Sequence, residues 1–81
     1  MLSIQNRSPK LSVRQLKAAR ALVGWSQAEL ARKSGISEPT IRRLESQEGE
    51  LGGLPSTIEA IRRALEDNGV RFIARGVELK G

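Results

Sequence analysis

The sequence contains no cysteine, no histidine and no tyrosine. Without cysteine the chain forms no disulfide and has no thiolate nucleophile. Without histidine it also lacks the usual zinc and copper ligands and the commonest general base. These absences exclude cysteine-, histidine- and zinc-dependent catalysis, and no residue pattern indicates a metal or cofactor. We therefore do not expect an enzyme.

Long apolar runs and aromatic side chains are also scarce. No apolar run approaches the roughly 20 residues that span a bilayer, so we expect a soluble cytoplasmic protein without a membrane partner. Trp25 and Phe72 are the only aromatic residues. Two isolated rings provide no stacking platform for single-stranded nucleic acid, so RNA binding is disfavoured. Trp25 fits better as a hydrophobic staple before a helix.

Positive charge is concentrated in the first half of the chain. Residues 1–43 contain nine Lys or Arg against two acids, a net charge of +7, whereas residues 44–81 contain five against seven, a net charge of −2. Such an asymmetry suits a polyanion, because neutralising phosphates releases counterions. Scattered basic residues that only keep the surface soluble are the alternative. With 81 residues, the chain makes one domain with a small core, which a partner subunit would help to stabilise.

Four segments have the periodicity of amphipathic helices. Capping boxes predict that three of them begin after Ser12, Ser26 and Ser56, with Gln15, Glu29 and Glu59 as the box partners. Glycines predict where these helices end: Gly24, Gly35 and Gly69. The remaining helix begins after its N-cap Ser37 and has Pro39 in its first turn. Residues 47–55, after this helix, are rich in glycine and are expected to form a loop.

The last segment, VRFIARGVELK, has β-branched and aromatic residues and no helical pattern, which predicts strands. An isolated two-stranded ribbon is marginal in water, so its apolar side chains must pack on something. A hairpin on its own domain and pairing across a dimer are both open, and an uncovered strand edge slightly favours the dimer. The dimer candidates are Val70, Phe72, Ile73, Val77 and Leu79.

The third helix has one apolar side and one polar side. At about 100° per residue, one side carries Ile41, Leu44 and Glu45, and the other carries Pro39, Arg42, Arg43 and Ser46. If the apolar side packs on the domain, the polar side is free to enter a major groove. There, Arg43 can present its planar fork to guanine, and Arg42 can reach a base or a phosphate.

Other candidate side chains lie near the start of this helix and of the preceding one. Thr40 and Pro39 can contact a thymine methyl group. Glu38 can accept a hydrogen bond from cytosine or complement the positive helix N-terminus, and the helix-end role is the favoured one. Gln27 opens the preceding helix, whose N-terminus is a ready phosphate site, or it is simply a solvated surface residue.

The segment LKAARALVGWSQAELARKSGISEPTIRRLESQEG, residues 16–49, strongly resembles the lambda-repressor-like, or Xre-type, helix-turn-helix family. The resemblance continues more weakly through residue 68. It implies a mainly α domain of four to five helices. Together with the patterns above, it predicts a flexible arm at residues 1–10, a helix-turn-helix domain at residues 11–69, and a β segment at residues 70–81 that is a possible dimerisation element. Where the family often has a glycine and a basic residue after the third helix, this chain has Gln47 and Glu48, which weakens the case for phosphate contacts there.

The resemblance also implies roles for single residues. Gln27 would contact a phosphate and support the recognition helix, Ser26 would cap and touch the DNA backbone, and Thr40 and Arg43 would read bases. It further suggests an ion pair between Arg20 and Glu45, since an unpaired carboxylate at the edge of the packed side would be costly. The complete set of DNA-binding candidates is Ser26, Gln27, Ser37, Glu38, Pro39, Thr40, Arg42, Arg43 and Ser46.

These observations predict a small transcriptional regulator, associated with the nucleoid, that reads an inverted-repeat operator in double-stranded DNA as a homodimer. Repression or autoregulation is the expected action, and a contact with RNA polymerase would allow activation. The alternative is an antitoxin-like or antiactivator module that binds a protein such as a toxin. The acidic loop at residues 48–54 and the C-terminal apolar strands are the surfaces that suggest it.

Overall fold

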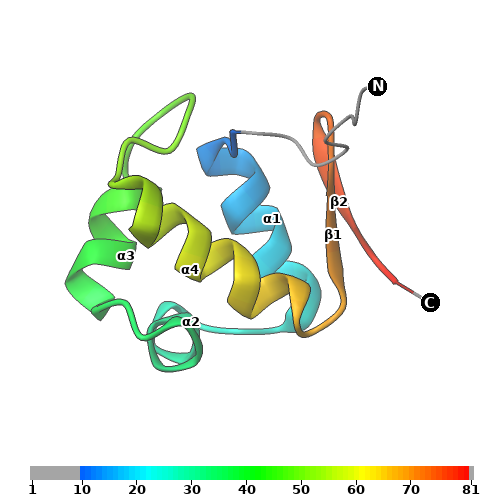
Figure 1. Ribbon diagram of the computed structural model, residues 1–81, viewed down its shortest axis with the longest axis horizontal. Coiled ribbons are helices and arrows are strands. Elements are labelled where there is room, and N and C mark those ends of the chain that lie inside the picture. Colours follow the sequence, from blue (N-terminus) through cyan, green and yellow to red (C-terminus); the bar gives the residue numbers. More distant parts are fainter. Residues whose placement is uncertain (1–9, 81) are drawn as a thin grey trace, which may run out of the picture.

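The computed structural model describes residues 10–80, which form four helices followed by a two-stranded antiparallel sheet (Figure 1). The elements in chain order are α1 (Val13–Val23), α2 (Gln27–Ser34), α3 (Glu38–Glu45), α4 (Pro55–Glu66), β1 (Val70–Ile73) and β2 (Gly76–Leu79). The predicted fold class, mainly helical with a C-terminal β segment, is confirmed. The predicted N-terminal arm lies outside the described residues except for Lys10.

The first two helices begin at the predicted serines. At α1 the capping box is complete: Ser12 Oγ accepts from the Gln15 backbone N–H, and Gln15 Oε1 accepts from the Ser12 N–H, both at 3.0 Å. At α2 only half of the predicted box forms. Ser26 Oγ accepts from the Glu29 N–H, but the Glu29 carboxylate binds Arg32 instead of the cap. The capping serine alone therefore fixes the start of α2.

Helix α4 begins earlier than predicted. Pro55 is its first residue and Leu54 its N-cap, without a side-chain cap hydrogen bond. Ser56 therefore lies inside the helix, and the capping box predicted for Ser56 and Glu59 is wrong. Proline has no N–H to satisfy and its φ is already helical, which makes it well suited to the first helical position.

One hydrophobic core joins all six elements. Its fully buried helix side chains are Leu16, Leu30, Ile41, Leu44, Ile61 and Leu65, and Val70 and Phe72 of β1 pack in the same cluster. Burying one leucine or isoleucine stabilises the fold by about 1.5–3 kcal/mol relative to exposure. Because α3 contributes two of these side chains, its inner side is packed against the domain.

The two strands form a hairpin within the chain, closed by Ala74 and Arg75, with Phe72 opposite Val77 and Val70 opposite Leu79. At its closed end, Gln15 Nε2 donates to the backbone oxygens of Ile73, at 2.6 Å, and Gly76, at 3.1 Å. This side chain is only 5% exposed. It therefore fixes the hairpin on α1.

The hairpin differs from the slightly favoured expectation that these strands pair across a dimer. They pair with each other, and Val70 and Phe72 lie in the chain's own core. The physical reason is the contact with α1 and α4, which covers the inner face of the sheet. Of the dimer candidates, Ile73 and Leu79 are exposed and Val77 is partly exposed.

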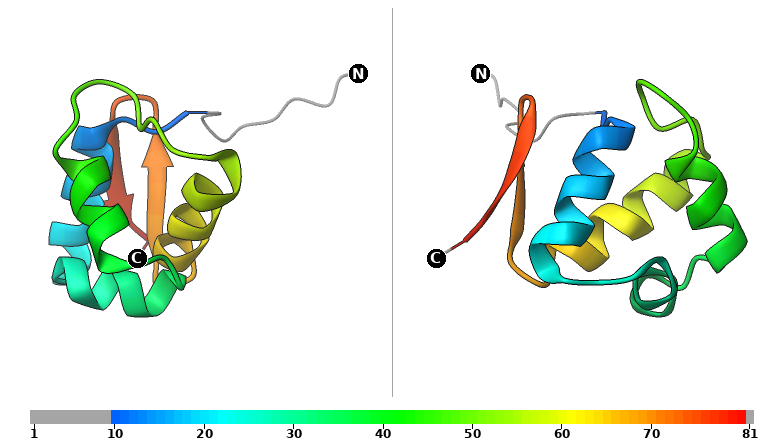
Figure 2. Two further views of the ribbon diagram at one scale, coloured as in Figure 1. Left: turned by 90° about the vertical axis from the view of Figure 1, so that its left-hand side faces the viewer. Right: turned by 180° about the vertical axis from the view of Figure 1, so that it is seen from behind.

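The third helix and the hairpin lie at opposite ends of the molecule along its longest dimension, which is 41 Å (Figures 1 and 2). Helices α1 and α4 lie between them, and α2 lies along one side. The loop before α4 is attached to the start of α1, where Val13 N donates to Gly49 O at 2.8 Å and Leu51 N to Leu11 O at 2.9 Å. This arrangement leaves the outer side of α3 at one end of the molecule.

Candidate nucleic-acid interface

Helices α2 and α3 pack against each other and are joined by only three residues, 35–37. Gly35 ends α2 with a φ of 77°, a left-handed conformation that glycine adopts without strain. Ser37 then caps α3, because its Oγ accepts from the Thr40 N–H at 3.4 Å. The short connection fixes the angle between the two helices.

The third helix presents the two sides that its sequence predicts. Ile41 and Leu44 are fully buried, and Glu45 is 5% exposed. The residues on the opposite side are all exposed: Pro39, Arg42, Arg43 and Ser46. A helix with one packed side and one polar, exposed side has the shape required to enter a major groove.

A cluster of three polar side chains connects α3 to the start of α2. Arg20 of α1 donates from Nε to Glu45 Oε2 at 2.7 Å and from Nη2 to Glu45 Oε1 at 2.8 Å. Gln27 Nε2 donates to the same Oε1 at 3.0 Å, and Arg20 Nη1 donates to the Trp25 backbone oxygen at 2.8 Å. The buried carboxylate therefore has partners from both neighbouring elements, and the cluster fixes α3 relative to α1 and α2.

This environment changes the acidity of both charged groups. Burial raises the pKa of Glu45, but the hydrogen bonds from Arg20 and Gln27 and the charges of Arg20 and Lys17 outweigh it, so the pKa lies below its ordinary value. The hydrogen bond with Glu45 raises the pKa of Arg20, partly offset by desolvation. Both groups are therefore charged at neutral pH.

The two neighbouring arginines on the outer side of α3 differ. Arg42 Nη2 lies 2.9 Å from Glu38 Oε2, four residues earlier, which forms an ion pair along the helix. The side chain of Arg43 has no hydrogen bond or ion pair with any residue in the range 10–80. Its guanidinium is therefore the one on this helix that is available to a ligand without breaking an existing contact.

The remaining candidates lie at the ends of the two helices. Ser26 and Ser37 are exposed N-caps, and Gln27 is half-buried through its bond to Glu45. Thr40 Oγ1 accepts from Ser37 Oγ at 2.9 Å, and Ser46 Oγ donates to the Arg43 backbone oxygen at 2.7 Å. All of these residues lie on α2 or α3, or at their ends.

Sequence reasoning missed two contacts. It did not pair Arg42 with Glu38, although their spacing of four residues on one helix was a sufficient signal. It used Gln15 only as a capping residue and did not place it at the hairpin. No local pattern indicates that second role, because the two carbonyls lie 58 and 61 residues away in the sequence.

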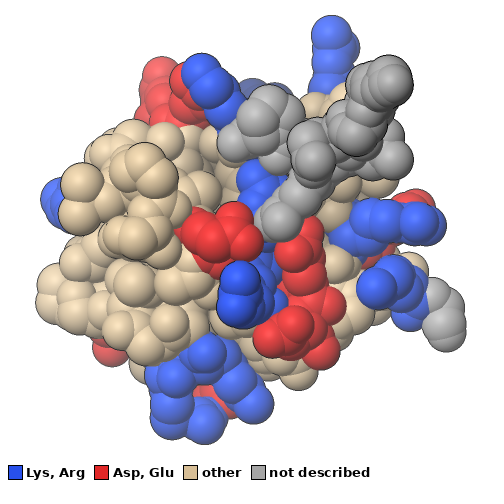
Figure 3. Space-filling view, in the orientation of Figure 1, with Lys and Arg blue, Asp and Glu red and all other residues tan. Residues whose placement is uncertain are grey.

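The face of the molecule over α4 has charges of both signs (Figure 3). Acidic and basic side chains alternate over α4, and basic side chains gather at the lower edge, where α2 lies. Arg32 and Lys33 belong to the last turn of α2. This face therefore does not offer a broad surface of one sign, in contrast to the basic bias of the first half of the sequence.

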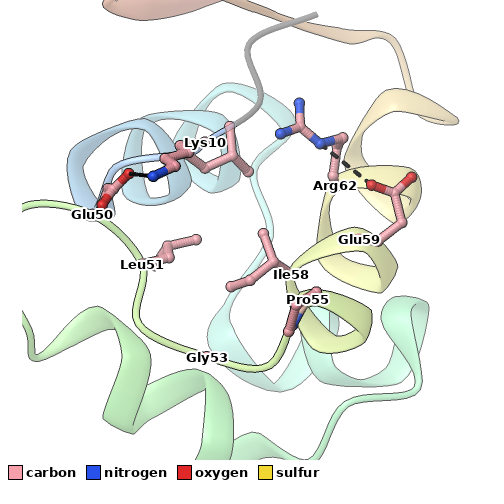
Figure 4. Close-up of a pocket in the computed structure, with 9 residues that line it drawn as sticks. Lys10, Glu50, Leu51, Gly53, Pro55, Ile58, Glu59 and Arg62 are labelled. Carbon is pink, nitrogen blue, oxygen red and sulfur yellow. Dashed lines mark ion pairs between the residues drawn. The ribbon is translucent and has the colours of Figure 1, made fainter.

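A separate hollow of about 380 Å³ lies between the start of α1, the loop before α4, and α4 itself (Figure 4). Leu51 and Ile58 line it, and two ion pairs lie at its margin: Lys10 with Glu50 at 3.4 Å, and Arg62 with Glu59 at 3.6 Å. Its lining includes no residue of α2 or α3. The hollow is therefore distinct from the outer side of α3.

Comparison with known families agrees with this geometry. Residues 16–53 match a family model described as helix-turn-helix. The match covers most of α1, both helices of the motif and the loop before α4, whereas α4 and the hairpin lie beyond it. No curated protein matches the chain.

Residues 16–53 therefore form a helix-turn-helix of the lambda-repressor-like, Xre type, a class of regulatory domain that binds double-stranded DNA. Within residues 10–80, no helix has the length and apolar character needed to cross a membrane.

Proposed function

We propose that this protein is a sequence-specific transcriptional regulator that binds an inverted-repeat operator as a homodimer and represses by occluding a promoter. The third helix enters the major groove, where Arg43 and Thr40 contact bases and Arg42 contacts a base or a phosphate. The N-terminus of α2, with Ser26 and Gln27, contacts the DNA backbone. A helix N-terminus attracts phosphate because its free N–H groups and its dipole both favour an anion.

The observation that carries the proposal is the exposed guanidinium of Arg43, which has no partner among the described residues and lies on a helix whose other side is fixed. Ile41 and Leu44 are buried, and the Glu45 carboxylate is bonded to both Arg20 and Gln27. A recognition helix reads sequence only if it meets the groove in one orientation. The fixed packing holds α3 in one orientation, and the exposed guanidinium provides the contact to a base.

Dimerisation is supported by size and by the exposed apolar side chains near the hairpin. One small module buries too little surface for tight, specific binding, whereas two copies related by a twofold axis read two half-sites about 10 base pairs apart. Leu79 is 49% exposed and Ile73 is 45% exposed, and both lie at the end of the molecule away from α3. A second subunit can contact this end without covering the recognition helix.

The direct test is selection of binding sites from a random duplex library, followed by footprinting of the selected sequence. We expect one enriched motif with twofold symmetry, protected over two adjacent major grooves on one side of the duplex. Uniform recovery of all sequences at moderate salt would contradict the proposal. An enriched motif without twofold symmetry would contradict binding as a homodimer.

A protein-binding role on the same fold is the second candidate. Leu54, in the loop before α4, is 70% exposed, the most exposed of the large hydrophobic side chains in the described residues, and Glu48 and Glu50 lie close to it in the sequence. An antitoxin-like or antiactivator protein would use such a loop to bind its target. This alternative predicts that Leu54→Ser abolishes the biological effect while DNA binding is unchanged.

A further inference from the structure

The ion pair between Glu38 and Arg42 lies on the part of α3 that the proposed function places in the groove. Glu38 is the first residue of the helix, and Arg42 is one turn further along. Their side chains are 40% and 59% exposed, so both are accessible to a ligand. An exposed pair of this type adds little to stability, because solvent screens it. Its effect on DNA binding is a separate question.

The pair changes what the helix offers to phosphates. Without it, Arg42 and Arg43 would be two adjacent mobile guanidiniums, and either would bind any nearby phosphate regardless of sequence. With the ion pair, Glu38 balances the charge of Arg42. The Glu38 carboxylate also repels the phosphates of a duplex that binds in the wrong position. A negative group at this position therefore weakens binding to all sequences unless one sequence compensates for it.

Such compensation is available from a base that presents an amino donor in the major groove. Glu38 Oε2 accepts from Arg42, and its other oxygen has no hydrogen bond within the described part of the chain. In the major groove, cytosine and adenine both present an amino donor, but the amino group of adenine lies beside its N7 acceptor, which repels a carboxylate. Guanine and thymine present acceptor oxygens, which repel it as well, so cytosine is the best partner. The free oxygen can accept from cytosine while Arg42 stays bonded to the first oxygen.

We propose that Glu38 is a specificity-determining residue: its carboxylate lowers affinity for non-cognate DNA and selects operators that place a cytosine amino group beside it. The inference rests on the proposed function, because it needs a duplex in contact with α3. It goes further by giving selectivity to an acidic residue and by naming the base that the residue prefers.

The test compares Glu38→Gln with Glu78→Gln. Both substitutions remove one negative charge and release an arginine, since Glu78 lies 2.6 Å from Arg71 across the hairpin, at the far end of the molecule. Affinity for the selected operator and for a duplex of unrelated sequence is measured over a range of salt concentrations, together with the melting temperature of each variant.

For Glu38→Gln, we expect the ratio of operator affinity to unrelated-duplex affinity to fall about tenfold, mainly because binding to the unrelated duplex becomes stronger. The logarithmic salt slope on that duplex should steepen by about one, because Arg42 becomes free to bind a phosphate. Glu78→Gln should leave the ratio within about twofold of the wild type. The double variant Glu38→Gln/Arg42→Ala should lose the added affinity for the unrelated duplex.

The operator preference at the contacted position provides a second readout. Wild-type protein should lose affinity when cytosine at that position is replaced by thymine, and Glu38→Gln should lose less. An unchanged ratio and an unchanged base preference in Glu38→Gln would overturn the inference. If the wild type itself showed no preference for any sequence, the proposed function would fail instead, so the two failures are distinguishable.

Discussion

The guanidinium of Arg20 binds the Glu45 carboxylate through two hydrogen bonds of 2.7 and 2.8 Å, which join α1 to the end of α3. The carboxylate side chain is only 4% exposed. Taking it out of water is costly, and the guanidinium offsets that cost only while both partners are present. The pair therefore orients α3 more than it adds net stability.

Removing one partner should be worse than removing both. We expect Arg20→Ala to destabilise the domain by about 3 kcal/mol, because a buried carboxylate loses its counter-charge. The double variant Arg20→Met/Glu45→Leu should lose less, since it leaves no buried charge. Urea unfolding followed by circular dichroism measures both. A milder loss in the single variant than in the double would show that the pair is not effectively buried.

Acid should weaken the fold through the same carboxylate. The pKa of Glu45 is lower in the folded chain than in the unfolded chain, so its contribution to stability is complete above the unfolded pKa of about 4.3. That contribution should decrease as the pH falls through the folded pKa. In Glu45→Gln, the unfolding free energy should therefore depend less on pH below about 5. Parallel curves for the two proteins would contradict the assignment.

Gln15 should be required for the position of the hairpin. Replacing it with alanine removes the two bonds to the carbonyls of Ile73 and Gly76 and the bond from Ser12, and we expect a loss of about 1–2 kcal/mol. Amide exchange in β1 and β2 should accelerate more than exchange in α3. Arg14→Ala, an exposed change on the same helix, serves as the control and should stay within about 0.5 kcal/mol of the wild type. Equal effects of the two variants would argue against a specific role.

Gly35 should tolerate asparagine better than alanine. Its φ of 77° is left-handed, and a Cβ at this position would meet nothing within 4 Å, so the cost of substitution comes from the backbone alone. We expect Gly35→Ala to lose about 1 kcal/mol and Gly35→Asn to lose less. Thermal unfolding of the two variants checks the order, and a reversed order would indicate that α2 ends differently.

Local signals predicted most of the fold because they act over a few residues. Ser12, Ser26 and Ser37 cap helices in the structure as they do in the sequence pattern, and the buried side of α3 follows from helical geometry. The prediction at Ser56 was wrong because Pro55, one residue earlier, starts the helix with no side-chain cap. Two strong local signals competed there, and the sequence contained no measure of which is stronger.

Contacts between distant segments were harder to predict. That the strands form a hairpin on their own domain depends on how α1 and α4 cover the sheet, and no short pattern contains that information. The pairing of Arg20 with Glu45 came from the family resemblance, whereas the bonds from Gln15 to the hairpin had no signal at all. The outer side of α3 was predictable because it needs only the period of one helix.

The most direct measurement for the central claim compares Arg43→Ala with Arg75→Ala on the selected operator. Both side chains are exposed and have no hydrogen bond or ion pair within residues 10–80, but Arg75 lies in the hairpin turn, at the other end of the molecule from α3. If Arg43 reads a base, its loss should weaken operator binding roughly 10- to 100-fold, or about 1–3 kcal/mol, while Arg75→Ala changes it by about twofold or less. Equal losses in the two variants would mean that only net charge matters, and would contradict sequence reading by α3.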